Sequence, residues 1–398
     1  MLQPEILEKE QAIPPVLRLA FRPFFLLPAL FSILALLAWV CVLQGKLNWN
    51  SLLPANIWHG HEMIFGFAAT VAVGFLLSAA QTWTGIRSIN SRKLAVIILF
   101  WLIARIALLS SSTPVLIIGT ISEALWWSGA ISYLAYMVVK SNNRRNLIFI
   151  PLLSLIMGLD IATLMFAFVG NYSLSTHLAY TAVFMITCVV TIVGGRVIPF
   201  FTSRALNLAT IKGNLFLERV IAIAMVVTLV SFVSSYYIDI TNVLAVLFVV
   251  TGCLQLLRMV NWQTSKTFKT PLLWALHLSY INMGLGFISI GMSYITTGIG
   301  FSSAVHIITV GTIGTMIIAM MSRVSLGHTG RSLQINTWIS CSFILLLSAT
   351  LFRVLLPVLG LFSMGYLLAA LCWSLGFVIY LIYYSPKLLT ARPDGRSG

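Results

Sequence analysis

The side chains of this sequence that could do chemistry lie inside long apolar stretches. An ionisable group in the hydrocarbon of a membrane costs about 2.5–3.5 kcal/mol even on insertion scales, so each one retained there is a candidate functional residue. Neutral imidazole is a common ligand of haem iron and copper, and histidines at one depth would therefore indicate a metal or haem site. The candidates are His59, His61, Glu62, Arg105, Glu123, Asp160, His177, His277, His306 and Arg353.

Two of these stretches resemble each other in sequence. HEMIFGFAATVAVGF begins at His61, and HIITVGTIGTMIIAM begins at His306. Together with His177 they predict a unit of four helices used three times, since internal repeats place sites at equivalent positions. We expect His61 and His306 to be axial haem ligands, with a glycine five residues later leaving room for the flat macrocycle. The matched positions are Gly66 and Gly311, Thr70 and Thr315, Thr84-Gly85 and Thr329-Gly330.

The motif WHGHEM contains two histidines with separate roles. At 100° per residue His59 and His61 point about 200° apart on a regular helix, so they do not bind one metal. His59 and Glu62 are about 60° apart and form either a second site or an outer pair that orients a ligand or carries protons. A cap at the helix start is the plain structural alternative for Glu62. We assign copper, or a second haem, to His177 with His59 as its partner.

Further polar residues are interpreted as outer contacts of these sites. Arg196 in GGRVIPFFT and Arg323 in SRVSLGHTGR each end an apolar stretch, where arginine anchors a span or contacts a lipid headgroup or haem propionate. We place His277 and His328 in the same class, toward the cytoplasmic side. For any single histidine, a hydrogen bond to a helix-end carbonyl is the ordinary alternative.

The elements that carry these residues are transmembrane helices. Hydrophobic residues make up 59% of the chain and charged residues 8%, far from the roughly 25% charged residues of a soluble domain. Unbroken apolar runs without strand-like alternation predict helices, and hence an all-α, polytopic integral membrane protein. The twelve predicted spans are 24–43, 62–80, 94–109, 115–139, 147–169, 176–198, 216–237, 240–260, 272–294, 303–321, 335–352 and 359–384.

Lysine and arginine positions give the orientation. With the N-terminus in the cytoplasm, only Lys46, Arg105 and Arg353 lie outside the cytoplasmic segments, as the positive-inside rule requires for an even number of spans. Residues such as Lys9 and Arg396 then place the N-terminal segment 1–22 and the tail 385–398 in the cytoplasm. We predict one transmembrane domain over 1–398, which includes both segments. The formal charge of +15 reflects this topology and not binding of nucleic acid.

The motifs LRLAFRPFF, WHGHEMIFGFAA, QTWTG, GGRVIPFFT, HIITVGTIGTM and SRVSLGHTGR occur in order between residues 17 and 331. In these the chain resembles the NnrS family. The resemblance implies a twelve-helix protein of the bacterial cytoplasmic (inner) membrane that carries haem and copper and acts in nitric oxide tolerance, often beside denitrification. It does not imply a particular reaction, ligand set or electron donor.

Three functions are open at this point. The first is a haem and copper protein that binds or handles nitric oxide or protects against nitrosative stress. The second is a secondary transporter, for which intramembrane Arg105, Glu123 and Asp160 would be natural. The third is a nitric oxide reductase like the haem-copper oxidase catalytic subunits. Those subunits place histidines on their second, sixth and tenth helices, and this chain has His61, His177 and His306 at the second, sixth and tenth predicted spans. Against the third, the span over 216–237 has no histidine to complete three-histidine copper ligation.

Overall fold

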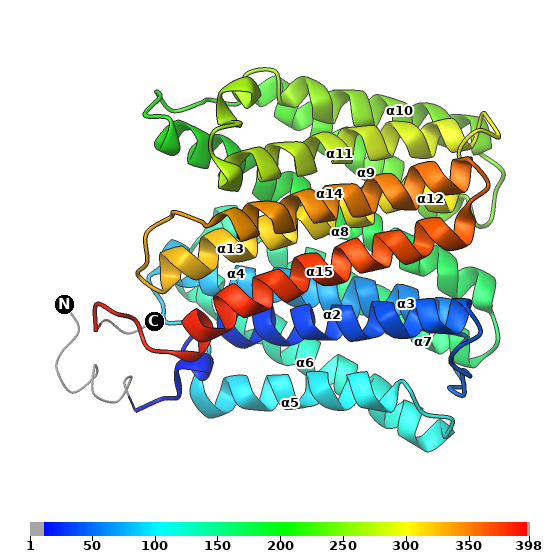
Figure 1. The fold of residues 1–398 in the computed structure, drawn as a ribbon, viewed down its shortest axis with the longest axis horizontal. Coiled ribbons are helices and arrows are strands. Elements are labelled where there is room, and N and C mark those ends of the chain that lie inside the picture. Colours follow the sequence, from blue (N-terminus) through cyan, green and yellow to red (C-terminus); the bar gives the residue numbers. More distant parts are fainter. Residues whose placement is uncertain (1–11, 396–398) are drawn as a thin grey trace. The chain divides into compact units, whose positions relative to one another are not determined.

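A computed structural model describes residues 12–395, and within this range the chain is helical without strands. Each of the twelve predicted spans matches a helix or a continuous run of helices, with predicted ends that pass the helix by three residues at most (Figure 1). Lys9 and Arg396, which the topology prediction uses, lie outside the described residues. The long helices are α2 (Phe21–Leu43), α5 (Ser91–Ala107), α6 (Thr113–Lys140), α7 (Phe149–Phe168), α8 (Tyr172–Ala205), α9 (Leu215–Ser234), α10 (Thr241–Arg258), α11 (Pro271–Ser293), α14 (Thr337–Val358) and α15 (Phe362–Leu389).

The other two spans are composite. In each, a short α-helix is followed by an eight-residue π-helix and then by a second α-helix. The first runs through α3 (Ala55–His61), η2 (Glu62–Ala69) and α4 (Thr70–Thr84). The second runs through α12 (Phe301–His306), η5 (Ile307–Gly314) and α13 (Thr315–His328). Short 3-10 turns are η1 (Pro15–Leu17), η3 (Arg144–Asn146) and η4 (Thr264–Thr267).

Eleven of these spans are long and apolar enough to cross a membrane. The twelfth, α5, has 17 residues and rises about 26 Å, slightly less than the ~30 Å hydrocarbon core of a bilayer. Large apolar side chains also face outward, such as Ile106 (72% exposed) and Ile382 (63% exposed). Such a surface is incompatible with water over this many helices, and it indicates a multi-pass protein in a lipid bilayer.

The chain forms two compact units. The first comprises Met1–Ala182, Met321–Gln334 and Phe377–Gly398, and the second comprises Val183–Met320 and Ile335–Gly376. Helices α8, α13 and α15 contribute residues to both units.

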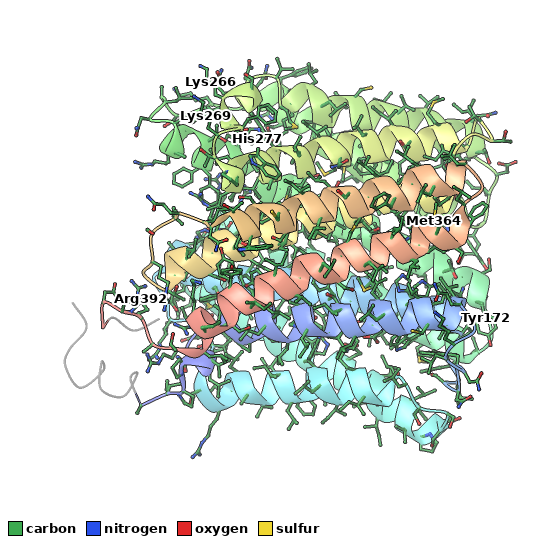
Figure 2. The ribbon with its side chains drawn as sticks, in the orientation of Figure 1. Tyr172, Lys266, Lys269, His277, Met364 and Arg392 are labelled. Atoms are coloured by element: carbon green, nitrogen blue, oxygen red, sulfur yellow. The ribbon has the colours of Figure 1, made fainter. Side chains whose placement is uncertain are left out.

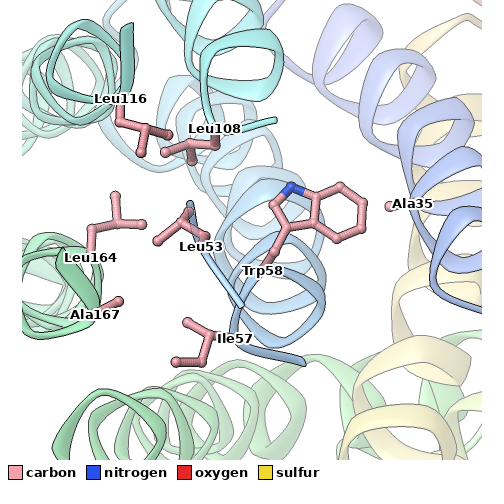
Figure 3. Close-up of a cluster of buried hydrophobic side chains, with 8 residues drawn as sticks. All are labelled: Ala35, Leu53, Ile57, Trp58, Leu108, Leu116, Leu164 and Ala167. Atoms are coloured by element: carbon pink, nitrogen blue, oxygen red, sulfur yellow. The ribbon is translucent and has the colours of Figure 1, made fainter. Parts of the chain in front are cut away.

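In the first unit, a hydrophobic cluster fixes the start of α3. Trp58 and Ile57 pack there with leucines of α6 and α7, as Figure 3 shows. The position of the next turn, which carries His61, is therefore set by dense packing. The buried members are Ala35, Leu53, Ile57, Trp58, Leu108, Leu116, Leu164 and Ala167.

In the second unit, α10 and α11 approach closely through glycines. A Cβ on Gly252 would lie 2.5 Å from the carbonyl oxygen of Gly284, and one on Gly291 would lie 2.6 Å from that of Ala245. Small residues permit such contact between membrane helices. The preceding turn is ordered by Asp239, whose Oδ1 accepts from the Thr241 amide at 3.1 Å and hydroxyl at 2.7 Å; these bonds lower the pKa of the Asp239 carboxyl.

Candidate functional site

The first unit contains a buried cluster of five ionisable side chains, each from a different helical element. His61 ends α3 and Glu62 begins η2, while Arg105, Glu123 and Asp160 come from α5, α6 and α7. Arg105 is 3% exposed and the other four are fully buried. We call these residues the acid–histidine cluster.

His61 lies between two carboxyl groups. Its Nε2 is 2.7 Å from Asp160 Oδ1, and its Nδ1 is 3.2 Å from Glu62 Oε1. Arg105 forms ion pairs with Glu62 and with Glu123, which lie on different helices. The guanidinium therefore connects the histidine side of the cluster to Glu123.

Two tryptophans hold the remaining carboxylate oxygens. Trp127 Nε1 donates to Asp160 Oδ2 at 2.8 Å, and Trp126 Nε1 donates to Glu123 Oε2. The two indole rings stack with centroids 4.4 Å apart. Since indole donates but does not accept, these bonds orient both carboxylates without adding charge.

Gly66, predicted to leave room for a haem, stands at a close contact with the cluster. A Cβ at this position would lie 2.3 Å from Arg105 Nη1 and 2.6 Å from Glu62 Oε2. The glycine makes room for the Arg105–Glu62 ion pair, and the space expected to receive a haem macrocycle is filled by these side chains. Arg105 also lies 5.7 Å from the Trp101 ring centroid, within cation–π range.

The cluster has the donor atoms of a metal site. One donor atom each from His61, Glu123 and Asp160 lie within 4.8 Å of one another. Glu123 and Asp160 come from our list of intramembrane residues, but we had considered them only for a transporter. The signal available in the sequence was that they are acidic residues within apolar runs.

The π-helices stand at the same offset from the two predicted haem ligands. Each begins at the residue after the histidine, has eight residues and ends before a threonine. The hydroxyls of these threonines, Thr70 and Thr315, both donate to the carbonyl five residues earlier, Phe65 at 2.8 Å and Val310 at 3.4 Å. π-Helical turns occur frequently at functional sites.

His306 belongs to the second unit, whereas His61 belongs to the first. His306 Nδ1 donates to the Ser302 carbonyl at 2.6 Å. A Cβ on Gly311 would lie 3.0 Å from Asn282 and Thr350, so this glycine also stands at a close contact.

The remaining predicted residues have varied surroundings. His59 stacks on Trp39 with ring centroids 4.9 Å apart, whereas His61 is fully buried. The two histidines therefore have different surroundings, as expected for side chains that point about 200° apart around a helix axis. His177 lies in α8, and its carbonyl accepts from the Thr181 hydroxyl at 2.9 Å. The metal assignments of His59 and His177 stay predictions.

Among the predicted outer contacts, only Glu62 belongs to the acid–histidine cluster. His277 in the second unit has both ring nitrogens 2.9 Å from hydroxyls, those of Thr202 and Thr264, which is a satisfied structural arrangement. Figure 2 shows it at the same end of the α10–α11 pair as Lys266 and Lys269.

His328, Arg196 and Arg323 were also predicted as outer contacts. His328 lies against Phe21 with ring centroids 5.4 Å apart, and its carbonyl accepts from Arg392. Arg196 and Arg323 are half-buried at the ends of their runs. Their roles as propionate or lipid contacts stay predictions.

Sequence reasoning missed a second charged network. In the second unit Arg258 pairs with Glu218 and donates to the Tyr280 hydroxyl at 2.7 Å. Tyr280 in turn donates to Gln255 at 2.7 Å. Arg258 had been used only as a topological charge, because the sequence does not show which helix it faces.

The fold and the cluster define a polytopic α-helical membrane protein with a buried cluster of ionisable side chains. A family model described as NnrS protein matches residues 15–392, nearly the whole chain. The chain therefore belongs to the NnrS protein family. No curated protein matches it.

Proposed function

We propose that this protein is a haem- and copper-containing protein of the bacterial cytoplasmic membrane that binds or handles nitric oxide or protects against nitrosative stress. Family membership supports the proposal. The observation that carries it is the π-helix that follows both His61 and His306 at one offset. π-Helical turns occur frequently at functional sites, so this backbone context supports a ligand role for the histidine that precedes each one.

His306 fits an axial haem ligand. Its Nδ1–H donates to a backbone carbonyl, which leaves the lone pair on Nε2. Metal-binding histidines usually have this second hydrogen bond, which fixes the tautomer and orients the ring. Bound haem would supply the iron at which nitric oxide binds.

His61 does not fit a haem ligand in the conformation described. Its Nε2 faces Asp160, and Arg105 and Glu62 fill the space beside Gly66. Haem ligation by His61 would require its ring to leave Asp160. We therefore favour His306 as the haem ligand, and His177 with His59 stays our proposed copper site.

The experiment is a haem and metal analysis of purified protein with reduced and nitric-oxide-bound optical spectra. We expect a Soret band that shifts on addition of nitric oxide. His306→Ala should lower haem content, and His177→Ala should lower copper. A protein without a Soret band after expression with sufficient haem would contradict the proposal.

A secondary transporter is the second candidate, and one observation favours it. Arg105, Glu123 and Asp160 come from three helices and meet in one buried cluster. Intramembrane ionisable groups of this kind mark ion or proton pathways. Substrate-dependent proton uptake by vesicles containing haem-free protein would support this candidate over the first.

Nitric oxide reduction is the third candidate. Two nitric oxide molecules, two electrons and two protons give nitrous oxide and water, so this reaction needs an electron donor and a proton supply. Rapid consumption of nitric oxide by the reduced, purified protein would promote this reading.

A further inference from the structure

The contacts of a neutral His61 leave one ring nitrogen facing a carboxyl oxygen without a proton or cation between them. A neutral imidazole has one N–H, yet both ring nitrogens of His61 face carboxyl oxygens. Whichever nitrogen carries the proton, the other nitrogen turns its lone pair toward a carboxyl oxygen, that of Asp160 at 2.7 Å or that of Glu62 at 3.2 Å. Two acceptors at that distance repel unless a cation or proton lies between them.

The charge of the whole cluster supports the same conclusion. Glu62, Glu123 and Asp160 contribute three negative charges, and Arg105 contributes one positive charge, so with neutral His61 the net charge is −2. Even an imidazolium would leave −1. Other ionisable groups do not appear in the described contacts of these five residues. A buried charge without a partner is expensive, so a cluster of ionised carboxylates needs a counter-cation or added protons.

We propose that the acid–histidine cluster binds one divalent transition-metal ion through His61 Nε2 and the carboxylates of Glu123 and Asp160. With His61 neutral, a divalent ion brings the net charge of the cluster to zero. The three donor atoms lie within 4.8 Å of one another. A tetrahedral site with bonds of about 2.1 Å needs donors about 3.4 Å apart. Binding would therefore bring the most distant donors closer by up to about 1.4 Å and would separate His61 Nε2 from Asp160 Oδ1, which lie 2.7 Å apart.

The neighbours of these ligands match the outer contacts of a metal site. With a metal ion on Nε2, the proton of His61 stands on Nδ1 and is donated to Glu62, the arrangement that orients metal-binding histidines and raises their basicity. Trp126 and Trp127 hold one oxygen of each ligating carboxylate. The other oxygen of Asp160 faces His61 Nε2, and the other oxygen of Glu123 pairs with Arg105, a contact that a bound metal ion would share or replace. Arg105 balances the charge of Glu62, so Glu62 need not enter the coordination shell.

The donor set defines the class of metal. One imidazole nitrogen and two carboxylates suit Zn²⁺, Mn²⁺, Fe²⁺, Co²⁺ or Cu²⁺, whereas Cu⁺ prefers the sulfur of cysteine or methionine. Three protein ligands leave a coordination position open for water or a small ligand. This site is separate from the histidine positions proposed above for haem and copper, and it does not rest on the nitric oxide function.

The test measures metal bound by the full-length protein in detergent. We would determine its metal content as purified, remove the metal with a chelator, and titrate with Co²⁺ as a probe by its d–d absorption. We expect one ion per chain. Asp160→Asn and Glu123→Gln should each weaken Co²⁺ binding at least tenfold. The control is Glu218→Gln, which removes another carboxylate paired with an arginine and should bind Co²⁺ like the wild type.

A second measurement covers variants that fold poorly. Asp160→Asn removes one of the excess negative charges, so the chelated variant should melt at or above the temperature of the chelated wild type. Co²⁺ should raise the melting temperature of the wild type and not that of the variant. Haem content and the nitric oxide spectrum, measured on the same samples, test the proposed function separately.

Three results would overturn the proposal. The first is a wild-type protein that contains no metal as purified and does not bind Co²⁺, because protons would then neutralise the cluster. The second is Asp160→Asn and Glu123→Gln variants with wild-type Co²⁺ affinity. The third is an equal loss of binding in the Glu218→Gln control.

Discussion

Replacing Arg105 tests whether electrostatics holds the first unit together. In Arg105→Gln the carboxylates of Glu62 and Glu123 lose the guanidinium that pairs them. Removing one partner of a buried ion pair costs about 3–5 kcal/mol, because the other charge stays buried and unpaired. Arg105 serves two carboxylates and also lies over two aromatic rings, so we expect a loss of about 5 kcal/mol.

The double variant separates charge balance from lost packing. Arg105→Gln together with Glu123→Gln removes one positive and one negative charge. It should be more stable than Arg105→Gln alone, by an interaction energy of about 2–3 kcal/mol. Arg204→Gln is the matched control, since Arg204 is exposed and should change stability by less than about 0.5 kcal/mol.

The assay is unfolding of chelated, purified protein in mixed detergent micelles, followed by tryptophan fluorescence. Near-wild-type stability of Arg105→Gln would refute the reasoning, since it would mean that the carboxylates are neutral without Arg105. Strictly additive effects in the double variant would refute it as well. An equal loss in Arg204→Gln would show that the assay reports surface effects.

Three other predictions concern the glycine, the haem ligand and the topology. Gly66→Ala should destabilise the protein by about 1–3 kcal/mol through its clash with Arg105, while Gly327→Ala, with open space around it, should not; thermal melts compare the two. His306→Ala should lower haem content in pyridine haemochrome spectra more than His328→Ala does, and equal spectra would count against the ligand assignment. Reporter fusions at two sets of positions test the topology: the first set should report the cytoplasm and the second the outside. Reversed locations for two adjacent loops would contradict the twelve-span topology. The cytoplasmic set follows Arg92, Arg145, Lys212, Lys269 and Arg331, and the external set lies near Asn48, Tyr172 and Gly298.

The helices could be predicted from the sequence because the signal for a membrane span is local. Each predicted run coincides with helix, and even the tight turn at Asp239 was visible between two apolar stretches. The π-helices were not predicted, because α- and π-helical turns use the same apolar residues. What the repeat comparison did detect was the context: the matched histidines, glycines and threonines flank or lie within the π-helical segments.

The partners of the site residues could not be predicted in the same way. His61 and Asp160 are separated by 99 positions, and Arg105 and Glu62 by 43, so their contacts depend on how α3, α5, α6 and α7 pack. Every member of the acid–histidine cluster had been recognised as costly in hydrocarbon. The sequence could not show that these side chains lie together in one cluster, where they contact one another.

The two matched histidines now differ in their chemistry. His61 faces carboxylates on both ring nitrogens, whereas His306 donates to a backbone carbonyl through Nδ1. An anionic cluster stabilises a divalent ion and would resist an apolar macrocycle. A histidine oriented by a neutral carbonyl carries no such excess of negative charge and suits haem iron. The same helix distortion thus follows a histidine twice, and we expect the charge around each ring to decide which metal that histidine binds.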